Sequence, residues 1–105
     1  MGRSFFYITA GDEKEAERVA TSLVEKNLVA CANVMSGVKS FFRWEGEVQS
    51  KKEFLVVGKT RTSLIEDLVQ EVKNVHSYDV PCVITWPIEK GNPDFLRWID
   101  SETKK

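Results

Sequence analysis

Two helical segments, each lying between strand-like segments, restrict the fold of this chain more than any other feature of its sequence. The first is predicted over residues 11–27, where Asp12 and Glu15 have the spacing of a capping box. The second is predicted to begin at Ser63, with Glu66 as its capping partner. Apolar residues recur at helical spacing in both segments and predict one buried face each. These expected faces are Ala16, Val19, Ala20, Leu23 and Val24 in the first, and Leu64, Ile65, Leu68, Val69 and Val72 in the second.

Strands are predicted where aromatic and β-branched residues cluster. The expected strands are residues 4–9, 28–35 continuing extended over 38–44, 47–60 and 82–86. Glu45-Gly46 indicates a hairpin turn between two of them. A last helix is expected from Asn92-Pro93, because Asn caps a helix and Pro suits its first turn. The residues expected to dock this helix are Phe95, Leu96 and Ile99.

The resulting βαββαβ order, followed by a helix, is a split βαβ arrangement of the α+β class. Right-handed crossovers would place both long helices on one face of the sheet. At 105 residues, the chain is expected to form a single domain over residues 1–105.

The strands do not alternate between apolar and polar residues, as strands of a half-solvated sheet do. Phe5 and Tyr7 lie opposite Phe6 and Ile8, so both faces of the first strand are apolar. In the second strand, the residues expected to point away from the helices are Val29, Cys31 and Met35. Because only a short helix remains to cover that face, we expect another copy of the chain to cover it.

Charge and composition exclude several classes of function. Fifteen basic and sixteen acidic residues give a net charge of -1, which supplies no field for nucleic acid or an anionic membrane. The first twelve residues are too poor in apolar side chains for a signal peptide. Two cysteines outside any C-x-x-C indicate free thiols in a cytosolic protein.

The segment HSYDVPC, residues 76–82, contains the only histidine of the chain. An imidazole is the commonest metal ligand, and Asp79 is close enough in sequence to bind with it or to orient its ring. The alternative is that His76 ends a helix, where its charge suits the last carbonyl groups. The residues of this segment leave the two interpretations open.

Four other residues have functional interpretations beside structural ones. Cys31 and Cys82 could bind a soft metal, although a cysteine inside an apolar strand is usually a packing residue. Lys59 lies at the end of a strand just before a helix start, where its charge and the free N–H groups of the helix could bind an anion. The structural alternative is a solvated strand end. Trp44 near the hairpin turn could form a ligand wall, and we favour a subunit contact.

No motif predicts catalysis. The sequence has one histidine and lacks the G-x-S-x-G, P-loop and dinucleotide patterns. The strand KKEFLVVGKT lacks the glycines and aromatic spacing of an RNA-recognition motif. GVKSFFRW resembles the phosphate-binding loop of acylphosphatases, but that interpretation is excluded. The loop precedes the first helix in those enzymes, whereas this segment leads into a hairpin.

Five segments in order resemble the CutA family of divalent-cation tolerance proteins. They are LVACANV (28–34), FFRWEGEV (41–48), GKT (58–60), HSYDVP (76–81) and NPDFLRWI (92–99). The resemblance implies a ferredoxin-like fold and a cytoplasmic homotrimer similar in shape to the PII signalling proteins. It also implies tolerance to copper and other divalent cations, copper binding, no required cofactor and no catalytic activity.

Carried over by position, the family's cleft residues are Cys31, Trp44, Lys59, His76, Tyr78 and Asp79. The leading hypothesis assigns a divalent cation, with copper foremost, to His76, Asp79 and Cys31. The chain departs from the family pattern at Ser77, where proline is usual, and at Asp79 and Cys82, where glutamates are usual. The alternatives are a trimer whose inter-subunit clefts bind a small anionic metabolite through Trp44, Lys59 and Tyr78, and a structural scaffold for a partner protein.

Overall fold

The computed structural model describes residues 2–104 as four strands and three α-helices in the order expected from the sequence. The elements are β1 (Arg3–Ala10), α1 (Glu13–Glu25), β2 (Cys31–Trp44), β3 (Glu47–Arg61), a 3₁₀ turn (Thr62–Leu64), α2 (Ile65–Val75), β4 (Val83–Pro87) and α3 (Pro93–Ser101).

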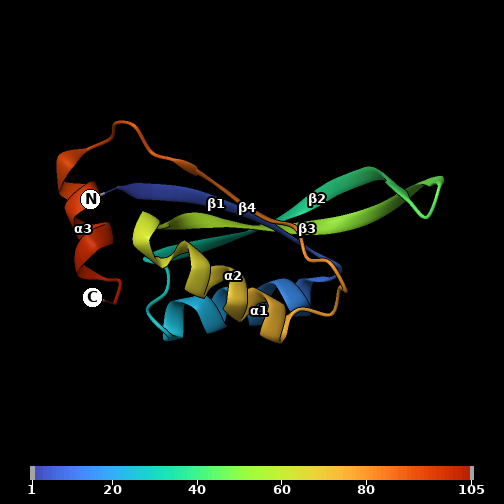
Figure 1. Cartoon of the computed structure of the whole chain (residues 1–105), viewed down its shortest axis with the longest axis horizontal. Helices are drawn as coiled ribbons and strands as arrows, with labels where there is room; N and C mark the ends of the chain where they lie inside the picture. The colour runs from blue at the N-terminus through green and yellow to red at the C-terminus, as the bar shows by residue number, and fades with distance from the viewer. Residues whose placement is uncertain (1, 105) are drawn as a thin grey trace.

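The strands form one antiparallel sheet in the order β2-β3-β1-β4. Helices α1 and α2 lie side by side on one face of it, while α3 lies at the end of the sheet opposite the β2–β3 turn (Figure 1). This arrangement confirms the predicted α+β, ferredoxin-like split βαβ fold with its long helices on one face. Among the described residues, no helix combines the length and apolar character needed to cross a bilayer.

The core lies between the sheet and the two long helices. Phe6 and Ile8 of β1 are fully buried and pair with Gly58 and Val56 of β3. A Cβ at position 58 would lie 2.7 Å from Phe6 Cζ, so this glycine lets the Phe6 ring cross β3. Each large apolar side chain buried here contributes about 1.5–3 kcal/mol to folding. The helices supply Ala16, Val19, Leu23, Leu68 and Val72 to the same cluster.

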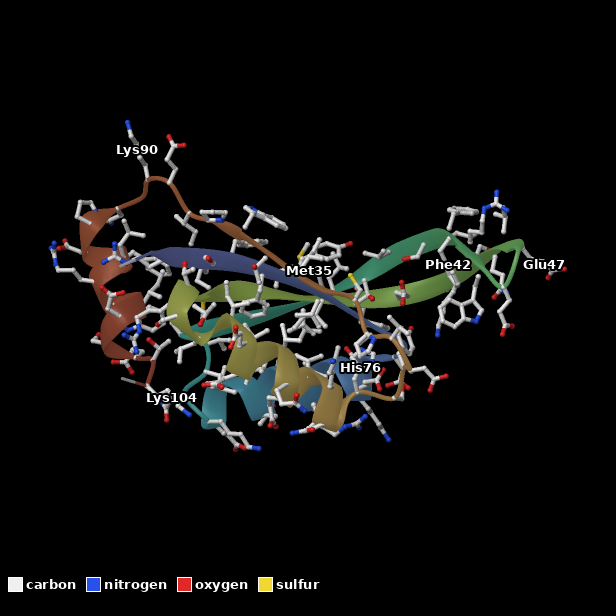
Figure 2. The ribbon with its side chains drawn as sticks, in the orientation of Figure 1. Met35, Phe42, Glu47, His76, Lys90 and Lys104 are labelled. Atoms are coloured by element: carbon white, nitrogen blue, oxygen red, sulfur yellow. The ribbon has the colours of Figure 1, made fainter. Side chains whose placement is uncertain are left out.

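The β2–β3 hairpin extends well beyond the end of β1. Residues 47–53 of β3 pair with β2 alone, and Figures 1 and 2 show this part projecting from the body of the molecule. Its turn has Glu45 at φ 51° and Gly46 at φ 82°, the left-handed conformation that two-residue hairpin turns require. The hairpin predicted from Glu45-Gly46 is therefore confirmed.

The face of the sheet opposite α1 and α2 is open and apolar. Phe5 pairs with Trp86, with ring centroids 4.9 Å apart, and Tyr7 pairs with Ile84. Trp86 is 45% exposed and Ile84 53% exposed. The chain therefore leaves on this face the uncovered apolar surface that the strand pattern predicted.

Several local predictions are wrong. The second helix has no side-chain cap, because the chain leaving β3 stays attached to β1: Thr62 N donates to Gly2 O, and the hydroxyls of Thr62 and Ser4 lie 2.7 Å apart. A 3₁₀ turn therefore precedes α2, and the predicted Ser63–Glu66 capping box does not form.

Three apolar residues also differ from expectation. Val29 is buried in the core instead of facing away, because β2 begins only at Cys31. Val24 and Phe95 are each 41% exposed, whereas burial was predicted. In α3 only Ile99 is fully buried.

Candidate functional site

The loop after α2 is anchored to β1 by the ring of His76. His76 is the C-cap of α2, and its side chain is fully buried. Nε2 lies 2.7 Å from the carbonyl oxygen of Thr9, and Nδ1 lies 3.1 Å from the amide nitrogen of Tyr78. A carbonyl can only accept a hydrogen bond, so Nε2 carries the proton and Nδ1 accepts from Tyr78. Both ring nitrogens are thus bound to the backbone of the protein.

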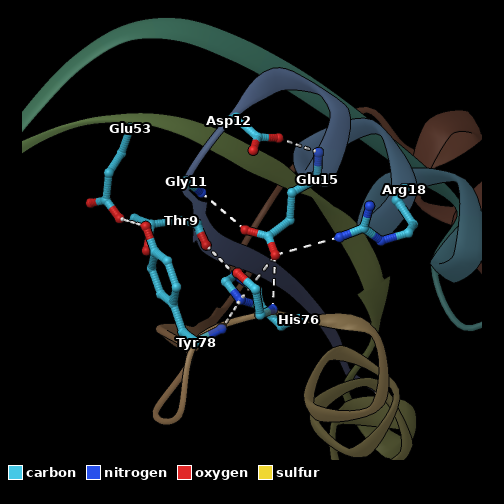
Figure 3. Close-up of polar contacts among 9 residues, drawn as sticks. Thr9, Gly11, Asp12, Glu15, Arg18, Glu53, His76 and Tyr78 are labelled. Atoms are coloured by element: carbon cyan, nitrogen blue, oxygen red, sulfur yellow. Dashed lines mark hydrogen bonds and ion pairs between the residues drawn. The ribbon is translucent and has the colours of Figure 1, made fainter.

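Glu15 of α1 holds the same loop from the helix side (Figure 3). Its two carboxylate oxygens accept from the amides of Gly11, at 3.1 Å, and Ser77, at 2.8 Å. Asp12 does cap α1, accepting from Glu15 N at 2.8 Å, so the predicted capping box is half formed. The other half is diverted, because the Glu15 side chain bonds Gly11 and the loop.

The environment of Glu15 sets its charge state. The side chain is 4% exposed, and burial by itself raises the pKa of a carboxyl group. The hydrogen bonds from Ser77 and Gly11 outweigh burial and lower the pKa of Glu15. Glu15 is therefore a carboxylate near neutral pH, and it is 3.8 Å from His76 Nδ1.

Tyr78 joins the loop to the hairpin. Its hydroxyl donates to Glu53 at 2.7 Å, and Lys51 Nζ lies 4.2 Å from the centroid of its ring. Burial, followed by the hydrogen bond to the Glu53 carboxylate, raises the pKa of Tyr78 far above its usual value. Tyr78 therefore stays a neutral phenol and acts as a hydrogen-bond donor.

A cleft of about 600 Å³ lies beside this contact, between the loop and the hairpin. Trp44, Tyr78 and Asp79 line it, so the structure brings together three of the residues that the sequence singled out. Cys82 also lines it, and burial raises the pKa of its thiol. Trp44 is 45% exposed and Asp79 is exposed, so both are accessible from solvent.

Cys31 and Lys59 lie elsewhere. They pair across β2 and β3 on the open face of the sheet, where Lys59 Nζ is 5.8 Å from the ring centroid of Phe95. Neither residue lines the cleft that contains Tyr78. The anion-binding set of Trp44, Lys59 and Tyr78 is thus not assembled within one protomer.

The predicted metal ligands do not form a group within the protomer either. Across residues 2–104, no three His, Cys, Asp or Glu side chains lie close enough together to hold a metal ion. Coordination by His76 would also require one of its two backbone hydrogen bonds to break. The fully buried ring of His76 fixes the loop, whereas the exposed carboxylate of Asp79 is free to meet a cation.

Three contributing residues were missed by the sequence reasoning, namely Glu15, Lys51 and Glu53. Glu15 was recognised only as a capping residue, from its spacing to Asp12. That spacing indicated a polar role at the start of the helix, but not a contact with the loop. Lys51 and Glu53 alternate on one face of the hairpin, yet nothing local shows that the loop 25 residues later covers that face. The contact depends on tertiary structure alone.

Together, these features define a class: a ferredoxin-like α+β chain with an open apolar sheet face, a long hairpin, and a loop anchored by a buried histidine. The model of the family described as "CutA1 divalent ion tolerance protein" matches residues 4–102. The chain belongs to this family.

Curated relatives and solved structures agree with this assignment. The divalent-cation tolerance protein CutA of Archaeoglobus fulgidus is 47% identical over 97 residues, which are 92% of this chain and 94% of the relative. That of Pyrococcus horikoshii is 39% identical over 94% of this chain and 96% of the relative.

Among solved structures, CutA1 from Oryza sativa has a TM-score of 0.97 at 38% identity, covering 100% of this chain and 96% of its own. The periplasmic divalent cation tolerance protein CutA of Archaeoglobus fulgidus has a TM-score of 0.93 at 45% identity, covering 97% of this chain and 99% of its own.

Proposed function

We propose that this chain acts as a cytoplasmic homotrimer that binds copper or a similar divalent cation in the response to metal ions, without catalysing a reaction. Membership of the CutA1 family supports the link to divalent cations. The observation that carries the proposal is the apolar sheet face opposite α1 and α2, where Ile84 and Trp86 are half exposed. Covering such a face with further copies of the chain removes apolar surface from water.

The trimer also gives the cation a location. Cys31 lies on the open face, whereas Asp79 lies at the cleft beside the hairpin. Because one protomer does not assemble three ligands, the proposed site draws its ligands from neighbouring protomers. The thiol of Cys31 suits a soft cation, and the carboxylate of Asp79 suits a harder one. His76 contributes by holding the loop, and it becomes a direct ligand only if a backbone hydrogen bond opens.

The oligomeric state and the cation are tested on the same preparation. Sedimentation of chelator-stripped chain at micromolar concentration is expected to show a trimer. Calorimetric titration with Cu(II) is expected to give a fixed ratio of copper to protomer, reduced in Asp79→Asn and in Cys31→Ser. Asp67→Asn, an exposed aspartate on α2, is the matched control.

The role of His76 needs its own comparison. His76→Ala removes a candidate ligand and two loop hydrogen bonds together, so it is paired with Glu15→Gln, which disturbs the same loop but keeps the imidazole. Copper binding lost only in His76→Ala supports ligation, and equal loss in both supports a structural role. A monomer, or unchanged copper affinity in all of these variants, would overturn the proposal.

A further inference from the structure

The cleft beside Tyr78 lies where the hairpin leaves the four-stranded sheet. Its walls are the end of β1, the β2–β3 hairpin beyond it and the loop after α2. Its volume of about 600 Å³ falls in the range of sites for small organic molecules. The cleft adjoins the open sheet face that the proposed trimer covers, because Tyr7, which pairs with Ile84 on that face, also lines the cleft.

Aromatic side chains form much of the cleft wall. The rings that line it are Tyr7 from β1, Phe42 and Trp44 from β2, and Tyr78 from the loop after α2. Phe42 is 36% exposed and Trp44 is 45% exposed, so these rings present apolar surface to whatever enters. Figure 2 shows Phe42 on the projecting part of the hairpin. Rings in such an arrangement suit a flat apolar group.

A buried carboxylate lies in the same cleft. Glu53 is 7% exposed, and one of its oxygens accepts the hydrogen bond from Tyr78. Among the described residues, nothing donates a hydrogen bond to its other oxygen, which Figure 3 shows turned away from Tyr78. No buried side-chain oxygen among the described residues lacks a hydrogen-bond partner, so this second oxygen is accessible, and a charged N–H donor would pair with it best. Glu53 therefore favours a ligand that carries an ammonium group.

Positive charges lie on the cleft as well. Lys51 Nζ is held over the ring of Tyr78, and Arg43 lines the hairpin wall. Within residues 2–104, Lys51, Arg43, Glu53 and Asp79 form no ion pairs with one another or with other side chains. A purely anionic ligand would meet two carboxylates, and a purely cationic ligand would meet two cations. Charges of both signs instead fit a ligand that carries both.

We infer that the cleft binds a small zwitterion: a free α-amino acid with an aromatic side chain. Its ammonium group pairs with Glu53, its carboxylate pairs with Lys51, and its side chain lies against Trp44 and Phe42. This function goes beyond cation binding and does not require the metal.

The test is calorimetric titration of the full chain in the presence of a chelator. The probes are L-tryptophan, L-phenylalanine, tryptamine, which lacks the carboxylate, and 3-indolepropionate, which lacks the amino group. We expect an aromatic amino acid to bind more tightly than either single-charge analogue. Because copper is absent throughout, failure here is separate from failure of the proposed function.

Two variants separate the two charges. Glu53→Gln is expected to weaken L-tryptophan and tryptamine roughly tenfold or more, the typical value of a charge-assisted hydrogen bond, and not to weaken 3-indolepropionate. Lys51→Gln, at an exposed position, is expected to weaken L-tryptophan and 3-indolepropionate and to spare tryptamine. Glu66→Gln, an exposed glutamate on α2, makes the same chemical change outside the cleft and should alter nothing.

The outcomes are decisive in both directions. Circular dichroism and sedimentation matching the parent show which variants remain folded, and Lys51→Gln keeps the test valid if Glu53→Gln does not fold. Binding of neither L-tryptophan nor L-phenylalanine overturns the inference, and is the result expected if a segment of another protomer fills the cleft. Equal binding of the amino acid and its analogues also overturns it.

Discussion

Replacing Glu15 by Gln tests how the loop is held, because it keeps the size of the side chain and removes its charge. The carboxylate accepts two backbone hydrogen bonds, from Gly11 and Ser77, while it is almost completely buried. A glutamine retains one acceptor, and its NH₂ group would face the other amide. Loss of one charge-assisted bond, with a buried donor left unpaired, costs about 2–4 kcal/mol of unfolding free energy.

The same substitution has a predicted pH dependence. The pKa of Glu15 is lower in the folded chain than in the unfolded chain, so its contribution is complete above the unfolded pKa and is lost as the pH falls through the folded value. The difference in stability between parent and Glu15→Gln should therefore be largest near neutral pH and shrink in acid. Glu71, whose pKa is lowered by its bonds to Ser22 and Lys26, leaves a second acid-sensitive group in both proteins.

Urea unfolding at matched protein concentration measures both effects, since stability of an oligomer depends on concentration. Glu17→Gln is the matched control, because Glu17 is an exposed glutamate on the same helix and its change should stay within about 0.5 kcal/mol. The reasoning fails if Glu15→Gln costs no more than Glu17→Gln, or if the difference persists unchanged in acid.

Three further substitutions test the fold. Gly58→Ala would press a Cβ against the backbone carbonyl oxygen of Cys31 and the buried ring of Phe6 and should cost about 3 kcal/mol, so an unchanged urea midpoint would contradict this packing. Thr60→Val removes the hydroxyl that donates to Leu28 O at 2.6 Å and should lower the free energy of unfolding by about 1–3 kcal/mol, measured by thermal unfolding. An unchanged melting temperature would contradict this, and would mean that water replaces the hydrogen bond without cost. Glu45→Asn places at φ 51° a residue that tolerates this conformation, and should add about 0.5 kcal/mol; a lower melting temperature would count against the turn assignment.

The fold was predictable because its main signals are local. The burial of Ala16, Val19 and Leu23 follows from helical spacing alone, and the turn at Glu45-Gly46 follows from residue preference. The start of α2 was not predictable, because it depends on Gly2 and on Ser4 of β1, which hold Thr62. The residues that signal a helix start are local in sequence, so they carry no information about this contact with a distant part of the chain.

The site was predictable only in part, for the same reason. The sequence indicated that His76, Tyr78 and Asp79 belong to one functional loop, and the structure places the last two on one cleft. Spacing in sequence could not show that the ring of His76 turns inward to Thr9, nor that Glu53 lies opposite Tyr78. Both contacts join segments that are distant in the chain.

The two sides of the loop therefore carry different roles. On its inner side, His76 and the amide of Ser77 bind β1 and Glu15, and these contacts fix where the loop lies. On its outer side, Tyr78 and Asp79 face the cleft, and their side chains can meet a ligand. Substitution of the inner group should change stability first and binding as a consequence, whereas substitution of Asp79 should change binding alone. Loss of a function in a His76 variant consequently identifies a ligand only when stability has been measured beside it.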